Sequence, residues 1–379
     1  MSSDLAGAKR IVVKVGSSLL IDSESGALRL EWLQSLVSDI AELKNANTEI
    51  LLVSSGAIAL GRRTLSLRPG ELRLEESQAA AAVGQVRLAQ AYVDAFHDFG
   101  FAAAQILVTL EDSEDRRRYL NARETLRTLL RLGAIPIINE NDTVATAEIR
   151  FGDNDRLAAR IAGMAEADHL VLLSDIDGLY TANPQRDETA SHIARVTSIT
   201  PEIEAMAEGP RSGVSRGGMQ SKIAAAKMAT STGASVIIAD GHVIHPLKAL
   251  AGPAKRTLFV PHMSPTAARK RWLAGGLSAK GVVVIDAGAV KALLSGKSLL
   301  PAGVVSVEGD FDRGDVVVVK NNAGAEIARG LVAYQTGEAR MLIGRRTVEI
   351  EGILGYRGRD EMIHRADLVL TGTNGSNGE

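Results

Sequence analysis

Cysteine is absent from this chain and aromatic residues are scarce. With no cysteine among 379 residues, disulfides, thiolate metal sites and a cysteine nucleophile are excluded. Aromatic residues make up 3% of the chain and the formal net charge is −2, so nucleic acid is not expected to be the main partner. Local basic clusters at 116–118 and 345–346 are interpreted as solvated faces. A chain without cysteine fits a reducing compartment, and we expect a cytoplasmic location.

Long apolar runs are also missing. No stretch approaches the roughly 18 residues that a membrane-spanning helix needs. The N-terminus passes Lys9 and Arg10 directly into the apolar run 11–13, without the apolar core and cleavage site of a secretory signal. We therefore expect no membrane segment and no leader.

Short apolar runs alternate with helical periodicity from Arg10 to about Asp240. This alternation is typical of an α/β fold, in which a largely parallel sheet is sandwiched by helices. The expected strands are 11–13, 50–53, 102–108, 135–138, 170–173 and 236–238. The expected helices are 33–43, 79–96, 120–132 and 219–231.

The pattern changes past about Pro253, and 379 residues exceed the roughly 100–200 of a typical domain. We expect a first domain over 1–253, a linker over 254–279, a small β-rich domain over 280–358 and a tail over 359–379. The tail is rich in Gly, Asn and Ser from Thr371 on, which predicts disorder. The expected strands of the small domain are 281–285, 304–307, 316–319 and 327–332.

Two acidic, amide-rich turns follow apolar runs, at 139–142 (Asn-Glu-Asn-Asp) and 152–155 (Gly-Asp-Asn-Asp). In open α/β sheets ligands bind where strands end. So many carboxylates and amides in two short turns require cationic partners, and Lys14 and Lys222 are candidates. Two lysines are also what a transferring phosphoryl group requires, so the set predicts a phosphoryl-transfer site.

Two further turns offer anion-binding groups. Lys14 leads into the turn 16–18 directly after the first expected strand, although a surface lysine would give the same pattern. Ser54, Ser55 and Gly56 stand between a strand and a helix, where a phosphate or carboxylate cradle and a simple capped turn are equally good interpretations.

The second half of the α/β region carries candidate nucleotide-binding turns. Ser174 and Asp175 follow a strongly apolar strand, and the run 216–222 places two glycines at a helix start with Lys222 one turn in. The spacing is not that of a Walker A loop, and no dinucleotide fingerprint follows a strand. The seven histidines are scattered, so a histidine metal site is not expected.

With these motifs the chain resembles the amino acid kinase family, and within it the members that phosphorylate glutamate and carry a C-terminal PUA domain. The segments that carry the resemblance are Val13–Ser17, Val53–Ala59, Ala82–Gln85, Leu120–Arg123, Asn139–Ala145, Phe151–Asp155, Ser174–Tyr180 and Gly217–Met219. The PUA resemblance covers about Lys280 to Gly358 and rests on 298–304 and 309–315.

The resemblance implies transfer of the ATP γ-phosphoryl group to the side-chain carboxylate of L-glutamate, the first step of proline biosynthesis. Lys14 and Lys222 would neutralise the phosphoryl group, and Asp155 would hold both lysines. Glutamate would be bound by Ser54, Asp142, Asn154 and Asp153. ATP would be held by Lys14, Ser174, Asp175, Arg216, Gly217, Gly218, Met219, Gln220, Ser221 and Lys222. Mg²⁺ would bridge the nucleotide phosphates, with no metal site made by protein side chains alone.

One position departs from the family pattern, which usually reads Gly-Thr-Gly-Gly-Met where this chain has Ser215 and Arg216 before Gly217. The change restricts the backbone and adds a guanidinium beside the nucleotide phosphates. The family also suggests feedback inhibition by proline and a homo-oligomer. The alternatives are a relative with another substrate, such as acetylglutamate or a uridylate, and an RNA-binding PUA protein with a kinase-like scaffold.

Overall fold

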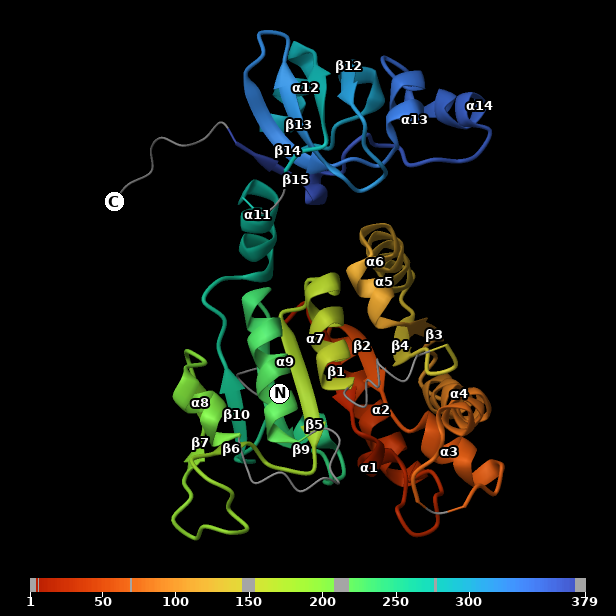
Figure 1. Ribbon diagram of the computed structural model, residues 1–379, viewed down its shortest axis with the longest axis vertical. Coiled ribbons are helices and arrows are strands. Elements are labelled where there is room, and N and C mark those ends of the chain that lie inside the picture. Colours follow the sequence, from red (N-terminus) through yellow and green to blue (C-terminus); the bar gives the residue numbers. More distant parts are fainter. Residues whose placement is uncertain are drawn as a thin grey trace. The chain divides into compact units, whose positions relative to one another are not determined.

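The computed structural model describes residues 5, 7–68, 70–144, 154–207, 218–275 and 278–371. The chain divides into two compact units, Met1–Pro265 and Thr266–Glu379 (Figure 1).

The first unit is built on an eight-stranded sheet with strand order β3-β4-β2-β1-β5-β9-β10-β8. Its strands are β1 (Arg10–Val15), β2 (Glu49–Ser54), β3 (Ala103–Val108), β4 (Ile135–Glu140), β5 (His169–Ser174), β8 (Arg195–Val196), β9 (Ser235–Asp240) and β10 (Arg256–Phe259). Neighbours pair in parallel except β9 with β10. A separate antiparallel pair joins β6 (Leu179–Tyr180) to β7 (His192–Ile193). The expected α/β fold with a largely parallel sheet is confirmed.

Helices cover both faces of this sheet, as Figure 1 shows. They are α1 (Ser17–Leu20), α2 (Leu30–Asn45), α3 (Ala57–Thr64), α4 (Leu74–His97), α5 (Leu110–Glu114), α6 (Arg116–Arg131), α7 (Asn154–Ala165), α8 (Pro201–Met206), α9 (Met219–Ser231) and α10 (Pro246–Ala249). Successive residues of a strand point to opposite faces, so Ile11 and Val13 of β1 join the core with α2 and α4. Val12 joins the other core with α7 and α9.

Helices α3 and α4 approach each other unusually closely because two glycines lie at their contact. A Cβ on Gly84 of α4 would stand 1.7 Å from the carbonyl oxygen of Ala57, and one on Gly61 of α3 would stand 1.7 Å from that of Ala80. No other residue type fits at either position without moving a helix. The contact holds α4 against the helix that follows β2.

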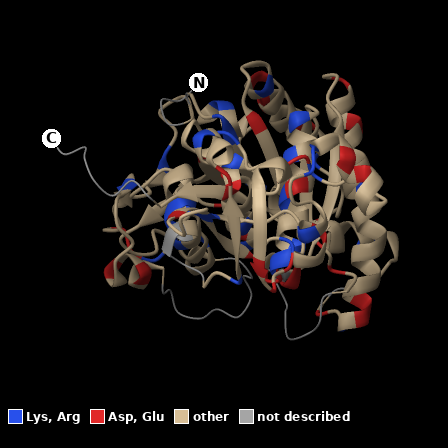
Figure 2. Ribbon diagram, turned by 90° about the horizontal axis from the view of Figure 1, so that it is seen from above, with Lys and Arg blue, Asp and Glu red and all other residues tan. Residues whose placement is uncertain are grey.

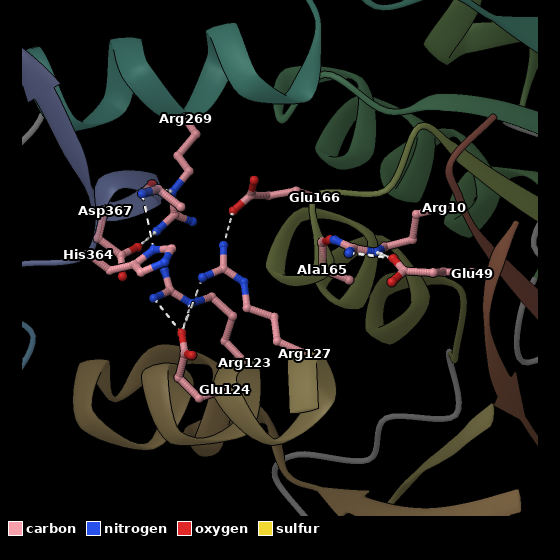
Figure 3. Close-up of polar contacts among 11 residues, drawn as sticks. Arg10, Glu49, Arg123, Glu124, Arg127, Ala165, Glu166, Arg269, His364 and Asp367 are labelled. Atoms are coloured by element: carbon pink, nitrogen blue, oxygen red, sulfur yellow. Dashed lines mark hydrogen bonds and ion pairs between the residues drawn. The ribbon is translucent and has the colours of Figure 1, made fainter. Parts of the chain in front are cut away.

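Ion pairs link elements of the first unit where β1 and β2 begin and where α7 ends (Figure 3). Arg10 at the start of β1 donates from Nε to Glu49 of β2 at 2.8 Å and also contacts the carbonyl oxygen of Ala165 at the end of α7. Arg127 of α6 pairs with Glu166 just past α7 at 2.7 Å. Both links fix α7, whose first residues enter the site described below.

The second unit holds a five-stranded sheet of order β12-β11-β13-β14-β15. Its strands are β11 (Gly281–Ile285), β12 (Val304–Gly309), β13 (Val316–Asn321), β14 (Glu326–Leu331) and β15 (Leu368–Leu370). Its helices are α11 (Pro265–Gly275), α12 (Ala287–Leu294), α13 (Thr336–Met341) and α14 (Ile350–Leu354), with short 3₁₀ turns at 301–303, 347–349 and 365–367. The expected β-rich character is confirmed. Strand β15 and helices α12 to α14 were not among the predicted elements.

Two segments differ from their expected place outside the domains. The expected linker contains β10, which pairs with β9 in the large sheet. Its alternate residues Thr257 and Phe259 are buried, a strand pattern that the neighbouring prolines concealed. The expected tail contains β15, which pairs with β14, and Arg269 of α11 contacts Asp367 beside it (Figure 3). The expected disorder falls mainly on 372–379, outside the described residues.

Charged residues of both signs are interspersed along the described part of the chain, as Figure 2 shows. This agrees with the net charge of −2. No helix among the described residues is long and apolar enough to cross a membrane.

Candidate phosphoryl-transfer site

Five neighbouring parallel strands, in the order β4-β2-β1-β5-β9, end at the same edge of the large sheet. Lys14 lies near the end of β1, with Ser54 ending β2 on one side and Ser174 ending β5 on the other. Glu140 ends β4, beyond β2. The expectation that the polar turns meet at strand ends is therefore confirmed for these elements.

Asp155, in the first turn of α7, lies between the two lysines that are 208 positions apart in sequence. Its Oδ1 is 2.6 Å from Lys14 Nζ and its Oδ2 is 3.2 Å from Lys222 Nζ. The side chains of Lys14, Asp155 and Lys222 are 12%, 1% and 5% exposed. Burial by itself raises the pKa of Asp155, but the charges and hydrogen bonds of Lys14 and Lys222 outweigh it and hold that pKa below its ordinary value. The carboxylate is thus ionised and fixes two ammonium groups at one point.

Asn154 precedes Asp155, and its side chain contacts residues where β2 and β4 end. Its Nδ2 donates to Ser55 Oγ at 2.6 Å, to the carbonyl oxygen of Ser54 at 3.1 Å and to Asn139 Oδ1 at 3.3 Å. The start of α7 therefore joins the ends of β2 and β4 to the lysine pair.

Helix α4 contributes two buried polar side chains that sequence reasoning did not assign to the site. Tyr92 OH lies 3.0 Å from Ser54 Oγ, and Gln85 Oε1 accepts from Asn139 Nδ2 at 2.7 Å. The sequence signals were a glycine inside a helix directly before Gln85, and a tyrosine in a stretch otherwise rich in alanine. Neither signal gave a direction for the side chain.

Carboxylates at the end of β4 are poorly solvated. Burial raises the pKa of Asp142 to about 6. Burial, followed by the nearby charge of Asp142, raises the pKa of Glu140 to about 8. Such a pair favours a cationic ligand, because a positive charge would lower the cost of ionising both groups.

The opposite side of β1 carries the candidate nucleotide groups. Ser174 Oγ donates to Asp175 Oδ1 at 2.9 Å at the end of β5. Helix α9 begins at Met219 after the N-cap Gly218, so Gln220, Ser221 and Lys222 fall in its first turn. Ser221 Oγ lies 3.4 Å from Asp155 Oδ2, so the start of α9 meets the start of α7 at the lysine pair. Free backbone N–H groups at a helix start are suited to phosphate oxygens.

Three expected site residues, Asp153, Arg216 and Gly217, lie outside the described residues. Asp142 is described, and its charge acts on Glu140. The remaining expected residues lie on, or within two residues of, the elements that meet at this edge.

Comparison with known proteins agrees with this architecture. The amino acid kinase family matches residues 9–240 and the PUA domain matches residues 281–354. The chain is 56% identical over 370 residues to the glutamate 5-kinase of Paramagnetospirillum magneticum, covering 98% of this chain and all of that protein. It is 58% identical to the glutamate 5-kinase of Bradyrhizobium sp. and 57% identical to that of Agrobacterium fabrum, over 97% of this chain and 98% and 94% of those proteins. The chain therefore belongs to the amino acid kinase family, in its glutamate 5-kinase branch with a C-terminal PUA domain.

Proposed function

We propose that this protein transfers the γ-phosphoryl group of ATP to the side-chain carboxylate of L-glutamate, giving L-glutamyl 5-phosphate and ADP in the first step of proline biosynthesis. The observation that carries the proposal is the pair of lysines held by one buried carboxylate, Asp155, at the edge of the sheet. Membership of the glutamate 5-kinase branch supports the choice of substrate.

In this reaction an oxygen of the glutamate side-chain carboxylate attacks the γ-phosphorus, and the bond from that phosphorus to the bridging oxygen of ADP breaks. The acceptor is already an anion at neutral pH, so no general base is required. Lys14 and Lys222 offset the negative charge that spreads over the transferring oxygens. Asp155 is too buried to accept the phosphoryl group itself, and it acts by holding the two ammonium groups in place.

We assign the two substrates to opposite sides of Lys14, an arrangement that the strand order supports. We assign glutamate to the β2 and β4 side, where Ser54, Asn154 and Asp142 offer a hydroxyl, an amide and a carboxylate; Asp153 belongs to this set from its place in sequence. ATP is assigned to the β5 and α9 side. There its candidate ligands are Ser174, Asp175, Gly218, Met219, Gln220, Ser221 and Lys222, with Arg216 and Gly217 added from sequence.

Mg²⁺ is part of the proposal as the companion of ATP. Among the described residues no group of three or more His, Asp or Glu side chains is placed to hold a metal ion. Mg²⁺ keeps several waters and commonly binds through substrate phosphates, so the ion is expected to arrive with the nucleotide and to neutralise its phosphate charge.

Three further parts of the proposal come from the family resemblance. We propose a cytoplasmic location, a homo-oligomer, and inhibition by proline. The ammonium and carboxylate of proline match the side chains that we assign to the ammonium and carboxylate of glutamate. Sedimentation of the purified protein tests the assembly. Glutamate-dependent activity measured with increasing proline tests the inhibition.

The proposed reaction is tested by incubating the purified chain with ATP, Mg²⁺ and L-glutamate and trapping the acyl phosphate with hydroxylamine. Aspartate, N-acetylglutamate and UMP serve as control acceptors. We expect hydroxamate only with glutamate, together with an equal amount of ADP. Turnover with a control acceptor and none with glutamate would overturn the substrate, whereas salt-sensitive RNA binding without turnover on any acceptor would favour the scaffold alternative.

A further inference from the structure

The orientation of the side-chain amide of Asn139 is fixed by a backbone N–H group, which can only donate a hydrogen bond. The backbone N–H of Glu140 donates to Asn139 Oδ1 at 2.9 Å. An N–H group is always a donor, so the side-chain atom facing it must be the carbonyl oxygen. The amide nitrogen of Asn139 therefore points to Gln85, at 2.7 Å.

This orientation fixes Gln85 in turn. Because Asn139 Nδ2 donates, the atom that it meets must be the carbonyl oxygen Oε1 of Gln85, and the amide nitrogen Nε2 is left over. Gln85 is 8% exposed, and its Nε2 has no hydrogen-bond partner among the described residues. A buried amide donor without a partner is costly, so an acceptor from a ligand is expected to fill this position.

The strand order indicates which part of the ligand meets Gln85. Asn139 lies on β4, which is two strands from β1 and its Lys14, and strands are spaced about 4.8 Å apart. The carboxylate that receives the phosphoryl group must lie beside Lys14. In glutamate a chain of three carbons separates that group from the α-carboxylate, which can therefore reach toward β4.

We propose that Gln85 Nε2 donates a hydrogen bond to the α-carboxylate of the amino acid substrate, an inference that rests on the proposed function. Gln85 thereby acts as a specificity-determining residue for the end of the substrate remote from the chemistry. Its oxygen holds Asn139, which contacts Asn154, so one amide links ligand recognition to the start of α7.

The substitution Gln85→Glu separates the two roles of this side chain. A carboxylate of the same shape can still accept from Asn139 Nδ2, but it offers no donor to the ligand and places a negative charge beside the α-carboxylate. We expect the KM for L-glutamate to rise at least tenfold, while the KM for ATP changes less than twofold. Gln90→Glu on the exposed side of α4 adds the same charge and is expected to leave both values unchanged.

A second substrate sharpens the test. L-isoglutamine carries an α-carboxamide in place of the α-carboxylate and keeps the reacting side-chain carboxylate. Its amide can donate to the carboxylate introduced by Gln85→Glu, so the ratio of kcat/KM for glutamate to that for isoglutamine is expected to fall at least tenfold in this variant and to stay constant in Gln90→Glu. A purely structural role for Gln85 would lower both activities together.

Circular dichroism and thermal unfolding first establish that Gln85→Glu is folded. If it is not, Gln85→Met, neutral and of similar volume, takes its place and is expected to raise the KM for glutamate at least fivefold with the KM for ATP unchanged. A folded variant whose glutamate KM and substrate ratio match those of the wild type would overturn the inference. Inactivity of the wild type itself with glutamate would instead overturn the proposed function.

Discussion

Ser54 Oγ and Tyr92 OH form a hydrogen bond of 3.0 Å, and both residues are fully buried. Burial raises the pKa of Tyr92, so the phenol keeps its proton and can donate it to Ser54. Among the described residues, Ser54 Oγ also lies 3.4 Å from the carbonyl oxygen of Ser55. That contact is long, so the hydroxyl proton of Ser54 can turn toward an anionic ligand.

The first prediction is that Tyr92→Phe weakens glutamate binding without stopping the chemistry. A lost neutral hydrogen bond costs about 1 kcal/mol, which corresponds to a rise of roughly fivefold in the KM for glutamate. Steady-state kinetics with each substrate varied in turn checks this. A rise in the KM for ATP of the same size would show that the substitution disturbs the fold and not Ser54.

The lysine pair gives the second prediction. Lys222→Ala is expected to lower kcat by about 10² or more, because one of two charges that stabilise the transferring group is removed. The fold is expected to survive, since Asp155 keeps Lys14 as a partner at 2.6 Å.

Lys227→Ala is the matched control for this lysine, because Lys227 lies on the same helix and its side chain is 64% exposed. Hydroxamate formation and thermal unfolding are measured for both variants. Near-normal turnover in folded Lys222→Ala would contradict the role given to this lysine.

Helix packing behind the site gives the third prediction. A Cβ at Gly84 meets backbone at 1.7 Å, so Gly84→Ala must move α3 or α4. We expect the free energy of unfolding to fall by about 3 kcal/mol. The activity of any folded fraction is also expected to fall, since α4 carries Gln85 and Tyr92.

A glycine in an open environment provides the control. A Cβ on Gly337 of α13 would meet no neighbouring atom within 4 Å, so Gly337→Ala is expected to be neutral or to stabilise by up to about 1 kcal/mol. Denaturant unfolding of the two variants measures the difference. Equal stability of Gly84→Ala and the wild type would show that the helices can separate at little cost.

The sheet and the polar strand ends could be predicted from sequence because each depends on a local pattern. Runs such as 170–173 are buried on both faces and read as parallel strands, and the acidic turn after β4 is contiguous. Gln85 and Tyr92 could not be assigned in this way. Their roles depend on how α4 packs against α3, and Gly61 and Gly84 determine that packing. The spacing of apolar residues along one helix does not reveal how two helices pack.

A carboxylate at the end of β4 gives the fourth prediction, on stability. Burial and the charge of Asp142 raise the pKa of Glu140 from 4.5 to about 8. Between these values the native state holds a proton that the unfolded state has released, so the free energy of unfolding falls as the pH rises through this window. Glu140→Gln cannot ionise and is expected to be more stable than the wild type at pH 8 by roughly 3 to 4 kcal/mol, against less than about 1 kcal/mol at pH 5. Thermal unfolding at both pH values checks this, and a difference that is larger at pH 5 would contradict the assigned direction.

Asp142 gives the last prediction, on the pH dependence of binding. Burial raises its pKa to about 6, so the group is neutral below that pH and ionised above it. If it binds the ammonium group of glutamate, only the ionised form contributes, and the KM for glutamate is expected to rise by up to tenfold for each pH unit below 6. In Asp142→Asn this dependence is expected to disappear, with a KM at pH 8 that is already high.

The KM for ATP is the internal control, because the nucleotide lies on the far side of β1 in the proposed arrangement. A glutamate KM that is constant from pH 5 to 8 in the wild type would show that Asp142 does not bind the substrate ammonium, and that the negative charge at the end of β4 serves another purpose.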